Sequence, residues 1–442
     1  MKTDFLIFYE HVNREVENDT LIKYELNKRG YSCEIMPFDG PEYFSRVLLR
    51  KKAKVLVVPW LRTDTNIYHY HYLAKKPYKF VNLQWEQISN KGIRACGIDT
   101  YSENAANSYH LCWGDFSQDI LIAKGGKKEK LPVVGAIQQD YNREIFKDYY
   151  LKKEDLAKKY SLDETKPWIL YVSSFSLANA SKQYIDELTS KYGEYFENAH
   201  KLNVESQNIT LEWIQRLIEK YDCEFIYRPH PTETSSPRLV NMKKEYKNFH
   251  IVSEHSVKQW AKVCNKVNLW ISTSNAELLA MDVKYNVVRP IELRPEQEME
   301  SMFGEQYITT YEEFKKSNIN GVTEADIELI KKRKENISKF YDYDDTVPAY
   351  SRVADALEKV LLNEGGTSYF FDSSQRKKSR KIFVRTVVFS MFMNMCKISE
   401  LLIKVLPIKK EWKRLVYAKT KEYRRGKNVE KDMLRYLNKY GE

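Results

Sequence analysis

The amino-acid sequence predicts an α/β fold with two successive parallel sheets and a helical extension at its end. Three observations predict it. Short apolar runs alternate with longer segments of helical period through most of the chain, as in parallel strands joined by crossover helices. A turn at 163–167 divides these runs into two sets. After residue 364 the composition changes, and the chain becomes basic and amphipathic.

The first set of predicted strands comprises the apolar runs 5–9, 32–36, 55–58, 79–84, 109–113 and 132–134. A helix over 20–29, stopped by Gly30, is the first crossover. The second set ends with a helix at 350–362 and comprises strands at 168–172, 223–227, 249–252, 269–271 and 286–288. Two such sets predict two Rossmann-like domains, over residues 1–150 and 151–364, before the extension 365–442.

The composition is that of a folded globular protein. Of 442 residues, 43% are hydrophobic and 30% charged, which excludes collagen-like and wholly disordered chains. The six cysteines are scattered without the CxxC spacing of redox or zinc sites. The apolar stretch 5–9 is too short for the core of a signal peptide, so we expect a cytoplasmic protein with reduced cysteines.

The basic charge is concentrated in the extension. The whole chain has a net charge of +11, whereas residues 376–442 hold 20 basic and 6 acidic residues, which leaves the remainder slightly negative. Such a segment predicts an anionic partner, either nucleic acid or an anionic membrane. Between 382 and 406, polar residues recur as one stripe among apolar ones, and the longest uncharged run, 386–396, is about half of what a spanning helix needs.

We therefore expect residues 376–425 to lie on an anionic membrane surface without crossing it. A nucleic-acid partner is disfavoured, because nucleic acid would leave the apolar face of the extension exposed to water. The alternative is a helical hairpin that packs on the body of the protein or on a second subunit, which leaves homo-oligomerisation open.

Residues directly after the predicted strands are the candidates for chemistry, because ligands bind at the carboxyl ends of the strands in open parallel sheets. The strand at 223–227 is followed by Arg228, Pro229, His230 and Pro231. Two prolines hold the backbone around one histidine, whose ring can donate a hydrogen bond or proton to a departing phosphate oxygen, with Arg228 beside it. The alternative is a proline-rich turn with a solvent-facing histidine.

A second candidate group follows the strand at 269–271. Ser272, Thr273 and Ser274 precede a predicted helix, whose first turn carries Glu277. Hydroxyl groups and free backbone N–H groups at a helix start favour a phosphate, and Glu277 is placed to accept hydrogen bonds from ribose hydroxyls. The alternative is an ordinary helix cap. Ser173 and Ser174, after the strand at 168–172, are predicted to contribute to the same edge.

The first domain carries acidic loops. Glu86 follows the strand at 79–84 and Glu15 follows the strand at 5–9, and either carboxylate is a candidate general base toward an acceptor hydroxyl. A structural hydrogen-bonding role is the alternative for both.

The motifs of cofactor enzymes are missing from the sequence. There is no GxGxxG or GxxxxGK[ST] motif, so neither a nicotinamide cofactor nor a P-loop is supported. His69 and His71 would share one face of an extended segment, but no third ligand follows at a suitable spacing. We expect no metal and no cofactor, and an aromatic cleft wall at 69–72.

The sequence resembles bacterial surface-polysaccharide transferases of the GT-B architecture, loosely over residues 1 to about 362. The segment 228–231 and the run 272–274 with Glu277 are similar to the motifs that bind the donor nucleotide in capsule Kdo transferases, bacterial sialyltransferases and teichoic-acid polymerases. The stretch 82–87 is similar to surface carbohydrate biosynthesis proteins and to the Trp-His-Gly loop of the teichoic polymerases, with Glu86 at the position of the proposed basic histidine.

The resemblance implies an inverting, metal-independent glycosyltransferase. It would transfer a sugar from a nucleotide-activated donor, such as the CMP-sugar CMP-Kdo, to a lipid-linked capsule or lipopolysaccharide glycan at the inner face of the cytoplasmic membrane. Transfer of glycerol- or ribitol-phosphate from a CDP-polyol and an inactive GT-B scaffold are the two alternatives.

Overall fold

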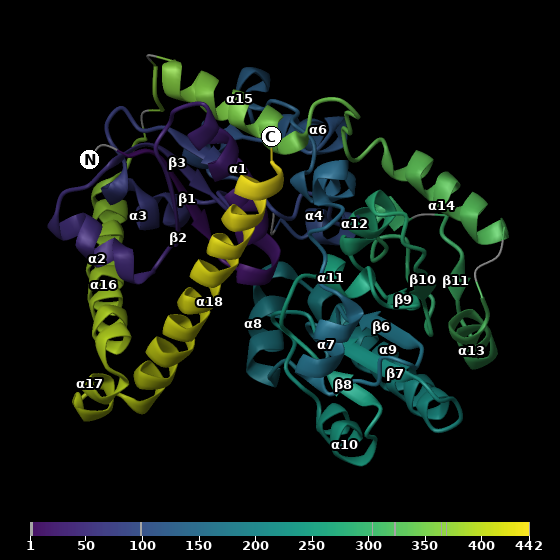
Figure 1. Cartoon of the computed structure of the whole chain (residues 1–442). Coiled ribbons are helices and arrows are strands. Elements are labelled where there is room, and N and C mark those ends of the chain that lie inside the picture. Colours follow the sequence, from purple (N-terminus) through teal and green to yellow (C-terminus); the bar gives the residue numbers. More distant parts are fainter. Residues whose placement is uncertain are drawn as a thin grey trace. The chain divides into compact units, whose positions relative to one another are not determined.

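In the computed structural model, five parallel strands form the sheet of a first unit, in the order β2-β1-β3-β4-β5 (Figure 1). The strands are β1 Thr3–Tyr9, β2 Cys33–Pro37, β3 Ala53–Val58, β4 Phe80–Asn82 and β5 Tyr109–His110. This unit comprises the described residues of Met1–Gln87, Thr100–Asp140 and Phe340–Glu442. The structure describes residues 3–97, 100–302, 304–321, 324–363, 365–367 and 369–441.

Six parallel strands form the sheet of a second unit, in the order β11-β10-β9-β6-β7-β8. They are β6 Trp168–Val172, β7 Glu224–Arg228, β8 Phe249–Ile251, β9 Lys266–Leu269, β10 Asn286–Val288 and β11 Tyr307–Ile308. All five residues of β6 are buried, because β6 has a strand on either side and lies within a sheet covered by helices. The unit comprises the described residues of Ile88–Asp99 and Tyr141–Lys339.

Helices connect the strands in both units. Those of the first unit are α1 Glu17–Lys28, α2 Pro41–Leu48, α3 Asp64–Tyr70, α5 Glu103–Ala106, α6 Asp115–Ala123, α15 Ala349–Leu362, α16 Ser373–Ile398, α17 Glu400–Val405 and α18 Lys410–Tyr440. Those of the second unit are α4 Lys91–Ala95, α7 Lys153–Tyr160, α8 Lys182–Tyr192, α9 Tyr195–Ile218, α10 Pro237–Glu245, α11 Val257–Ala261, α12 Ser274–Ala280, α13 Tyr311–Ile319 and α14 Glu324–Ile337.

The predicted α/β class, with two Rossmann-like sheets and a helical extension, is confirmed. Most predicted strands lie within a few residues of the observed ones, and β6 coincides with its prediction. Two local differences stand out. The run 132–134 forms no strand, because only Val133 pairs, in an isolated bridge with Cys112. Strand β11 is only two residues long, too short to leave a pattern in the sequence.

Helix α15 lies with the first unit, whereas the sequence places it at the end of the second domain. The guanidinium of Arg29, at the end of α1, donates to Asp355 at 2.6 Å, and Tyr31 donates to Glu358 at 2.6 Å. On α15, Val353 and Leu357 are buried. The same division of the chain assigns residues 88–99 to the second unit. Glu364 and Ser368, at the predicted junction with the extension, fall outside the described residues.

The extension forms a hairpin of α16 and α18, joined through α17, that packs on the first unit (Figure 1). Phe389, Met393 and Val416 are buried in a small core between the hairpin's helices. Gly426 allows α18 to approach β1 closely, since a Cβ there would lie 2.5 Å from the hydroxyl of Tyr9. Part of the apolar face of the extension is therefore buried within the protein, as in the alternative of a helical hairpin that packs on the body, and association with a membrane stays a prediction.

Asp19 on α1 is fully buried, and neither of its carboxylate oxygens has a hydrogen-bond partner among the described residues. Burial, with Glu15 and Glu430 nearby, raises the pKa of Asp19 well above its usual value. The unfolded chain loses this proton at the ordinary Asp pKa, about 4, whereas the folded chain keeps it. The wild type therefore loses stability as the pH rises above that value.

We expect Asp19→Asn to raise the free energy of unfolding by about 1–3 kcal/mol at pH 8 and by less at pH 5, because the amide cannot ionise. Thermal unfolding followed by circular dichroism at both pH values measures this. The exposed Asp119→Asn on α6 is the matched control. An Asp19→Asn variant whose advantage does not grow with pH would contradict the assignment of a buried, protonated carboxyl.

Candidate active site

In the second unit, the predicted site residues lie at the carboxyl ends of three neighbouring strands, β9, β6 and β7. Adjacent strands are about 4.8 Å apart, so β9 and β7 are separated by about 10 Å with β6 between them. The hydroxyl of Ser174, after β6, accepts a hydrogen bond from the backbone N–H of Ile271 at 3.2 Å. The hydroxyl of Tyr227 on β7 lies 2.8 Å from the hydroxyl of Ser173. These two contacts connect the three strand ends.

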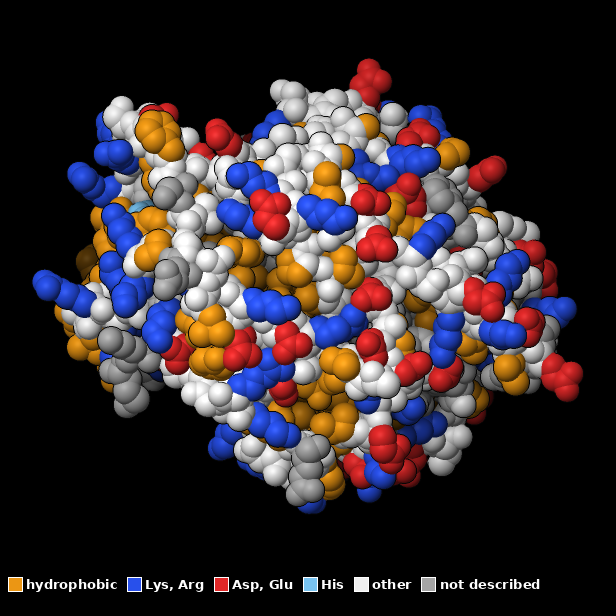
Figure 2. Space-filling view, turned by 90° about the horizontal axis from the view of Figure 1, so that it is seen from above, with side chains coloured by type: hydrophobic (Ala, Val, Ile, Leu, Met, Phe, Trp, Pro, Cys, Tyr) orange, Lys and Arg blue, Asp and Glu red, His pale blue; other side chains and the backbone are white. Residues whose placement is uncertain are grey.

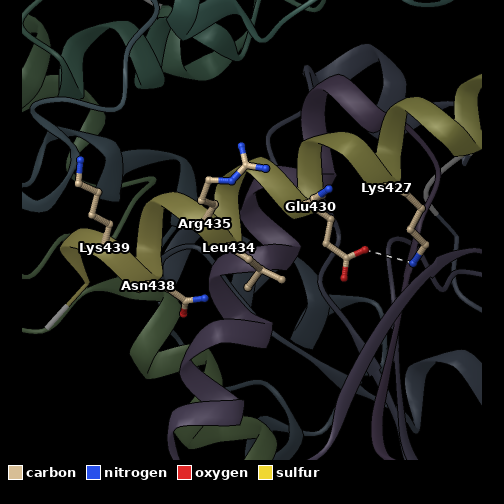
Figure 3. Close-up of a pocket in the computed structure, with 7 residues that line it drawn as sticks. Lys427, Glu430, Leu434, Arg435, Asn438 and Lys439 are labelled. Atoms are coloured by element: carbon tan, nitrogen blue, oxygen red, sulfur yellow. Dashed lines mark hydrogen bonds and ion pairs between the residues drawn. The ribbon is translucent and has the colours of Figure 1, made fainter.

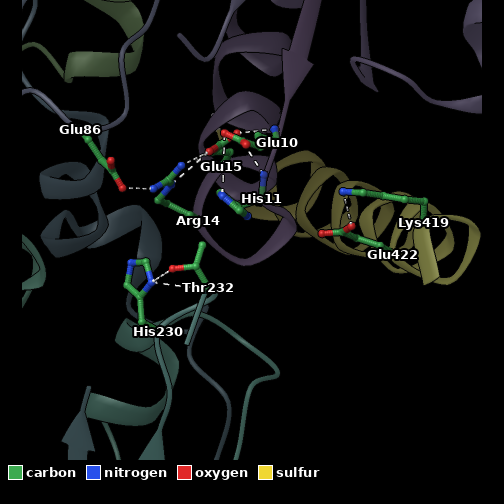
Figure 4. Close-up of polar contacts among 9 residues, drawn as sticks. All are labelled: Glu10, His11, Arg14, Glu15, Glu86, His230, Thr232, Lys419 and Glu422. Carbon is green, nitrogen blue, oxygen red and sulfur yellow. Dashed lines mark hydrogen bonds and ion pairs between the residues drawn. The ribbon is translucent and has the colours of Figure 1, made fainter. Parts of the chain in front are cut away.

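His230 lies on the loop after β7, with its ring half-buried. Its Nδ1 atom accepts a hydrogen bond from the backbone N–H of Thr232 at 3.3 Å, and the Thr232 hydroxyl lies 2.8 Å from the same nitrogen (Figure 4). A neutral imidazole whose Nδ1 accepts carries its proton on Nε2. The loop therefore sets the tautomer in which Nε2 is a hydrogen-bond donor, as a phosphate-binding histidine requires.

Glu233 is the centre of the hydrogen bonds that hold this loop. One carboxylate oxygen accepts from the Ser173 hydroxyl at 2.6 Å and from the backbone N–H of His230 at 3.1 Å. The other accepts from the Tyr227 hydroxyl at 2.6 Å and from Gln207 at 3.1 Å. Burial, with Glu233 adjacent, raises the pKa of Tyr227 well above its usual value, so the phenol stays a donor. The carboxylate thus fastens the His230 loop to β6 and β7.

The Ser/Thr run lies at the end of β9, as predicted. Ser272, Thr273 and Ser274 are half-buried, and the backbone N–H of Ser274 donates to the Ser272 hydroxyl at 3.2 Å. Glu277 is in the first turn of α12 and is also half-buried. The run therefore flanks the Ser174 side of β6, while His230 flanks the Ser173 side. Their contacts with a nucleotide stay predictions.

Arg228 is the last residue of β7 and is buried. Its guanidinium donates to the backbone carbonyl of Glu254 at 2.9 Å and to that of His255. These bonds anchor the loop that follows β8. We therefore assign Arg228 a structural role at the edge of the site, and its predicted phosphate contact stays a prediction.

We expect Glu233→Gln to weaken nucleotide binding about tenfold, because an amide cannot accept from all four donors and one buried donor is left unpaired. Titration calorimetry with the nucleotide that most stabilises the wild type measures this. Glu205→Gln, exposed on α9, is the matched control. Unchanged nucleotide affinity in Glu233→Gln would show that the loop does not depend on this carboxylate.

In the first unit, a pocket of about 210 Å³ lies at the carboxyl ends of the strands. It is lined by Glu10, Arg14, Pro59, Trp60, Arg62, Gln84, Trp85 and Glu86. The predicted Glu86 is its most accessible carboxylate, with 57% of the side chain exposed. Carboxylates, guanidinium groups and indole rings around one small pocket are suited to a polar sugar acceptor.

Arg14 lies between two carboxylates of this pocket region (Figure 4). Its guanidinium pairs with Glu15 at 2.7 Å and with Glu86. Arg14 and Glu15 belong to a π-helical segment, Val12–Val16, which directly precedes α1. Segments of this kind are frequent at functional sites, because they displace side chains from the regular helical positions.

Glu15 is fully buried. Its carboxylate also accepts from the backbone N–H groups of Glu10 at 2.6 Å and His11 at 3.3 Å, and burial raises its pKa. A buried carboxylate with both oxygens engaged cannot reach an acceptor without breaking these bonds. We therefore assign Glu15 the positioning of Arg14 rather than the proton transfer that the sequence suggested.

Glu10 is a second carboxylate of the pocket. Burial raises its pKa, with Glu86 adding to the rise while Arg14 and Lys419 of α18 oppose it. A carboxyl group with a raised pKa is a stronger base. The sequence places Glu10 after the first strand, but only the pocket singles it out from its neighbours.

Sequence reasoning did not single out Glu233, Tyr227 and Thr232 of the second unit. A glutamate three residues after His230, in the order His-Pro-Thr-Glu, was the available signal. The segment 69–72 is helical rather than extended, because His69 and Tyr70 end helix α3. The His71 ring packs against the aromatic ring of Phe371 at a centroid distance of 6.0 Å, and the aromatic cleft wall stays a prediction.

Among the described residues, no group of three or more His, Cys, Asp or Glu side chains could hold a metal ion. A shallow hollow of about 850 Å³ runs along α18 (Figure 3). All of its lining residues belong to this one helix, without polar groups that converge from several elements as in a binding site, so we assign it no role.

Comparison with known proteins reveals similarity of fold. No family model matches the sequence, and no curated protein matches it either. A histidine-to-alanine variant of the wall teichoic acid polymerase TagF matches with a TM-score of 0.51 and 12% identity, over 82% of this chain and 90% of that one. A histidine-to-asparagine variant soaked with CDPG matches with a TM-score of 0.51 and 12% identity, over 82% and 89%.

UDP-GlcNAc 2-epimerase of Methanocaldococcus jannaschii, in complex with UDP-GlcNAc and UDP, matches with a TM-score of 0.48 and 15% identity, over 81% of this chain and 100% of that one. At such identities a likeness establishes the fold alone. The two Rossmann-like domains of this chain have the fold of the GT-B enzymes.

Proposed function

We propose that this chain is an inverting, metal-independent glycosyltransferase that uses a nucleotide-activated sugar donor. The second unit would hold the donor and the first unit the acceptor. The acceptor hydroxyl attacks the anomeric carbon, its proton passes to a carboxylate, and the bond from that carbon to the phosphate oxygen breaks. The nucleotide then leaves with the electron pair of that bond.

The observation that carries the proposal is the hydrogen bond that Nδ1 of His230 accepts from the backbone N–H of Thr232, which favours a proton on Nε2. His230 follows β7, Ser173 and Ser174 follow the adjacent strand β6, and the run 272–274 follows β9 on its other side. An Nε2–H donor stabilises negative charge on a departing phosphate oxygen. The TagF structure from a CDPG soak shares this fold, which supports a nucleotide-linked donor.

In this proposal the acceptor binds in the pocket of the first unit, where a carboxylate takes the proton of its hydroxyl group. Glu86 is the proposed base, because it is the pocket's exposed carboxylate, and Arg14 orients it. We propose a lipid-linked capsule or lipopolysaccharide glycan as the acceptor and the inner face of the cytoplasmic membrane as the place of reaction. A CMP-sugar such as CMP-Kdo is the first donor to test.

The test is a thermal-shift screen with CMP, CDP, UDP, GDP and TDP, followed by incubation of the best donor with acceptor membranes. A ligand that binds only the folded protein raises the melting temperature. We expect one nucleotide to stand out and its sugar conjugate to release free nucleotide. Stabilisation by none of them, and no nucleotide release, would favour an inactive GT-B scaffold instead.

A second candidate is the transfer of glycerol- or ribitol-phosphate from a CDP-polyol. The observation in its favour is the shared fold with TagF, whose soak contained CDPG. Mass spectrometry of the product separates the two reactions, since one forms a glycosidic bond and the other a phosphodiester.

A further inference from the structure

Helix α16 has two different sides, and one of them is occupied by the protein itself. On that side Ser390 donates to the backbone carbonyl of Gly40 at 2.7 Å, and Asn394 donates to that of Pro41 at 2.7 Å. The neighbouring Phe389 and Met393 are buried. These contacts hold α16 against the start of α2, so this side is not available to any partner.

The other side of α16 forms a basic groove of about 500 Å³ with α18. It is lined by Lys377, Arg380, Lys381, Val384, Arg385, Val388 and Trp412. The four basic residues and Val384 are exposed, and no acidic side chain lines the groove. A groove with basic walls and an apolar floor is suited to a phosphate group joined to an apolar body.

The same side leads to an apolar tip at the turn of the hairpin. Ile398, at the end of α16, is 82% exposed, and on α17 Leu401 is 66% and Val405 78% exposed. Positions 377, 384, 391 and 398 are seven residues apart, so they follow one stripe of α16 from the groove to the tip. Lys404, Lys409 and Lys410 surround the tip and are exposed as well.

We propose that this surface, the basic groove with the apolar tip, docks the protein on an anionic phospholipid bilayer. The tip side chains would enter the headgroup region, and the groove would bind lipid phosphates. Exposed apolar side chains next to a cluster of basic ones are what such an interface requires. Figure 2, seen from above, shows Lys and Arg side chains beside hydrophobic ones at the left edge, the side on which α16 lies in Figure 1, whereas the tip at the lower end of the hairpin faces away from this view.

The charge and the exposed apolar side chains of this surface favour an anionic bilayer over two other partners, a second copy of the chain and nucleic acid. A second copy of the chain would bring one basic groove against another, and like charges would oppose that contact. Nucleic acid would satisfy the basic side chains but would leave Leu401, Val405 and Ile398 in water. Among the described residues, no helix combines the length and apolar character needed to cross a bilayer.

The test is flotation of the full-length protein with vesicles of phosphatidylglycerol and phosphatidylcholine, compared with phosphatidylcholine alone. No donor or acceptor is present, so the result is independent of the proposed catalytic function. We expect binding to the anionic vesicles to be at least tenfold stronger and to weaken in 0.5 M salt, since salt screens charges.

Two double variants separate the groove from the tip. Lys377→Glu with Lys381→Glu and Leu401→Asp with Val405→Asp are each expected to weaken vesicle binding at least tenfold. All four side chains are exposed, so the fold should persist, which circular dichroism checks. The matched charge control is Lys243→Glu with Lys244→Glu on α10, exposed in the second unit and expected to change binding less than twofold.

Three results would overturn the proposal. The first is wild-type binding that does not depend on anionic lipid. The second is a pair of variants that bind vesicles as the wild type does. The third is a loss of dimerisation or of RNA binding in the variants, measured by sedimentation or gel shift, without any vesicle binding by the wild type.

Discussion

His230→Ala is expected to lower sugar transfer at least about 100-fold, with the fold unchanged. In the proposed reaction, the variant loses the Nε2–H donor to the departing phosphate, and such donors or acids contribute about 10²–10⁴ in rate. The loop itself should stay in place, because Glu233 holds it through the backbone N–H of residue 230 rather than through the ring. Initial rates of nucleotide release measure the effect, and the melting temperature verifies folding.

His230→Gln refines this result. The amide nitrogen of glutamine can occupy the position of Nε2 and donate a hydrogen bond, but it cannot transfer a proton. Partial recovery relative to His230→Ala would indicate hydrogen-bond stabilisation, and no recovery would indicate acid catalysis. His250→Gln, on strand β8, is the matched control and can keep its hydrogen bond to Glu224. Full activity in His230→Ala would contradict the role of His230 on which the proposed function rests.

Glu86→Gln is expected to lower kcat at least about 100-fold with little change in KM for the donor, because the amide cannot take the acceptor proton. The substitution keeps the size of the side chain and its contact with the Arg14 region. Glu10→Gln in the same pocket is the matched comparison, expected to lower kcat less than tenfold. Steady-state kinetics with varied donor and acceptor measure both.

The reverse pattern, with Glu10→Gln the more damaging, would transfer the role of base to Glu10. A base is active when deprotonated, so the rate falls toward acidic pH where the base becomes protonated. If Glu86 is the base, this acidic limb of the rate profile should persist in Glu10→Gln and disappear in Glu86→Gln.

Site positions at strand ends could be predicted from sequence, whereas the hydrogen bonds among them could not. His230, Ser173 and the run 272–274 follow apolar strands, and in a parallel sheet every strand end faces the same edge. Glu233 left only a weak signal, because its role depends on Ser173, Tyr227 and Gln207 from other elements. The burial of Glu15 could not be predicted for a related reason, since it depends on how the π-helical segment packs.

The sequence by itself determined the α/β class, most of the strands and the helical, basic character of the extension. These follow from local periodicity and composition, which neighbouring residues carry. Tertiary structure decided which unit receives α15, and which side of α16 remains exposed. An apolar side chain leaves water equally well against Gly40 and α2 or against lipid, so the pattern of apolar residues cannot distinguish the two until the chain has packed.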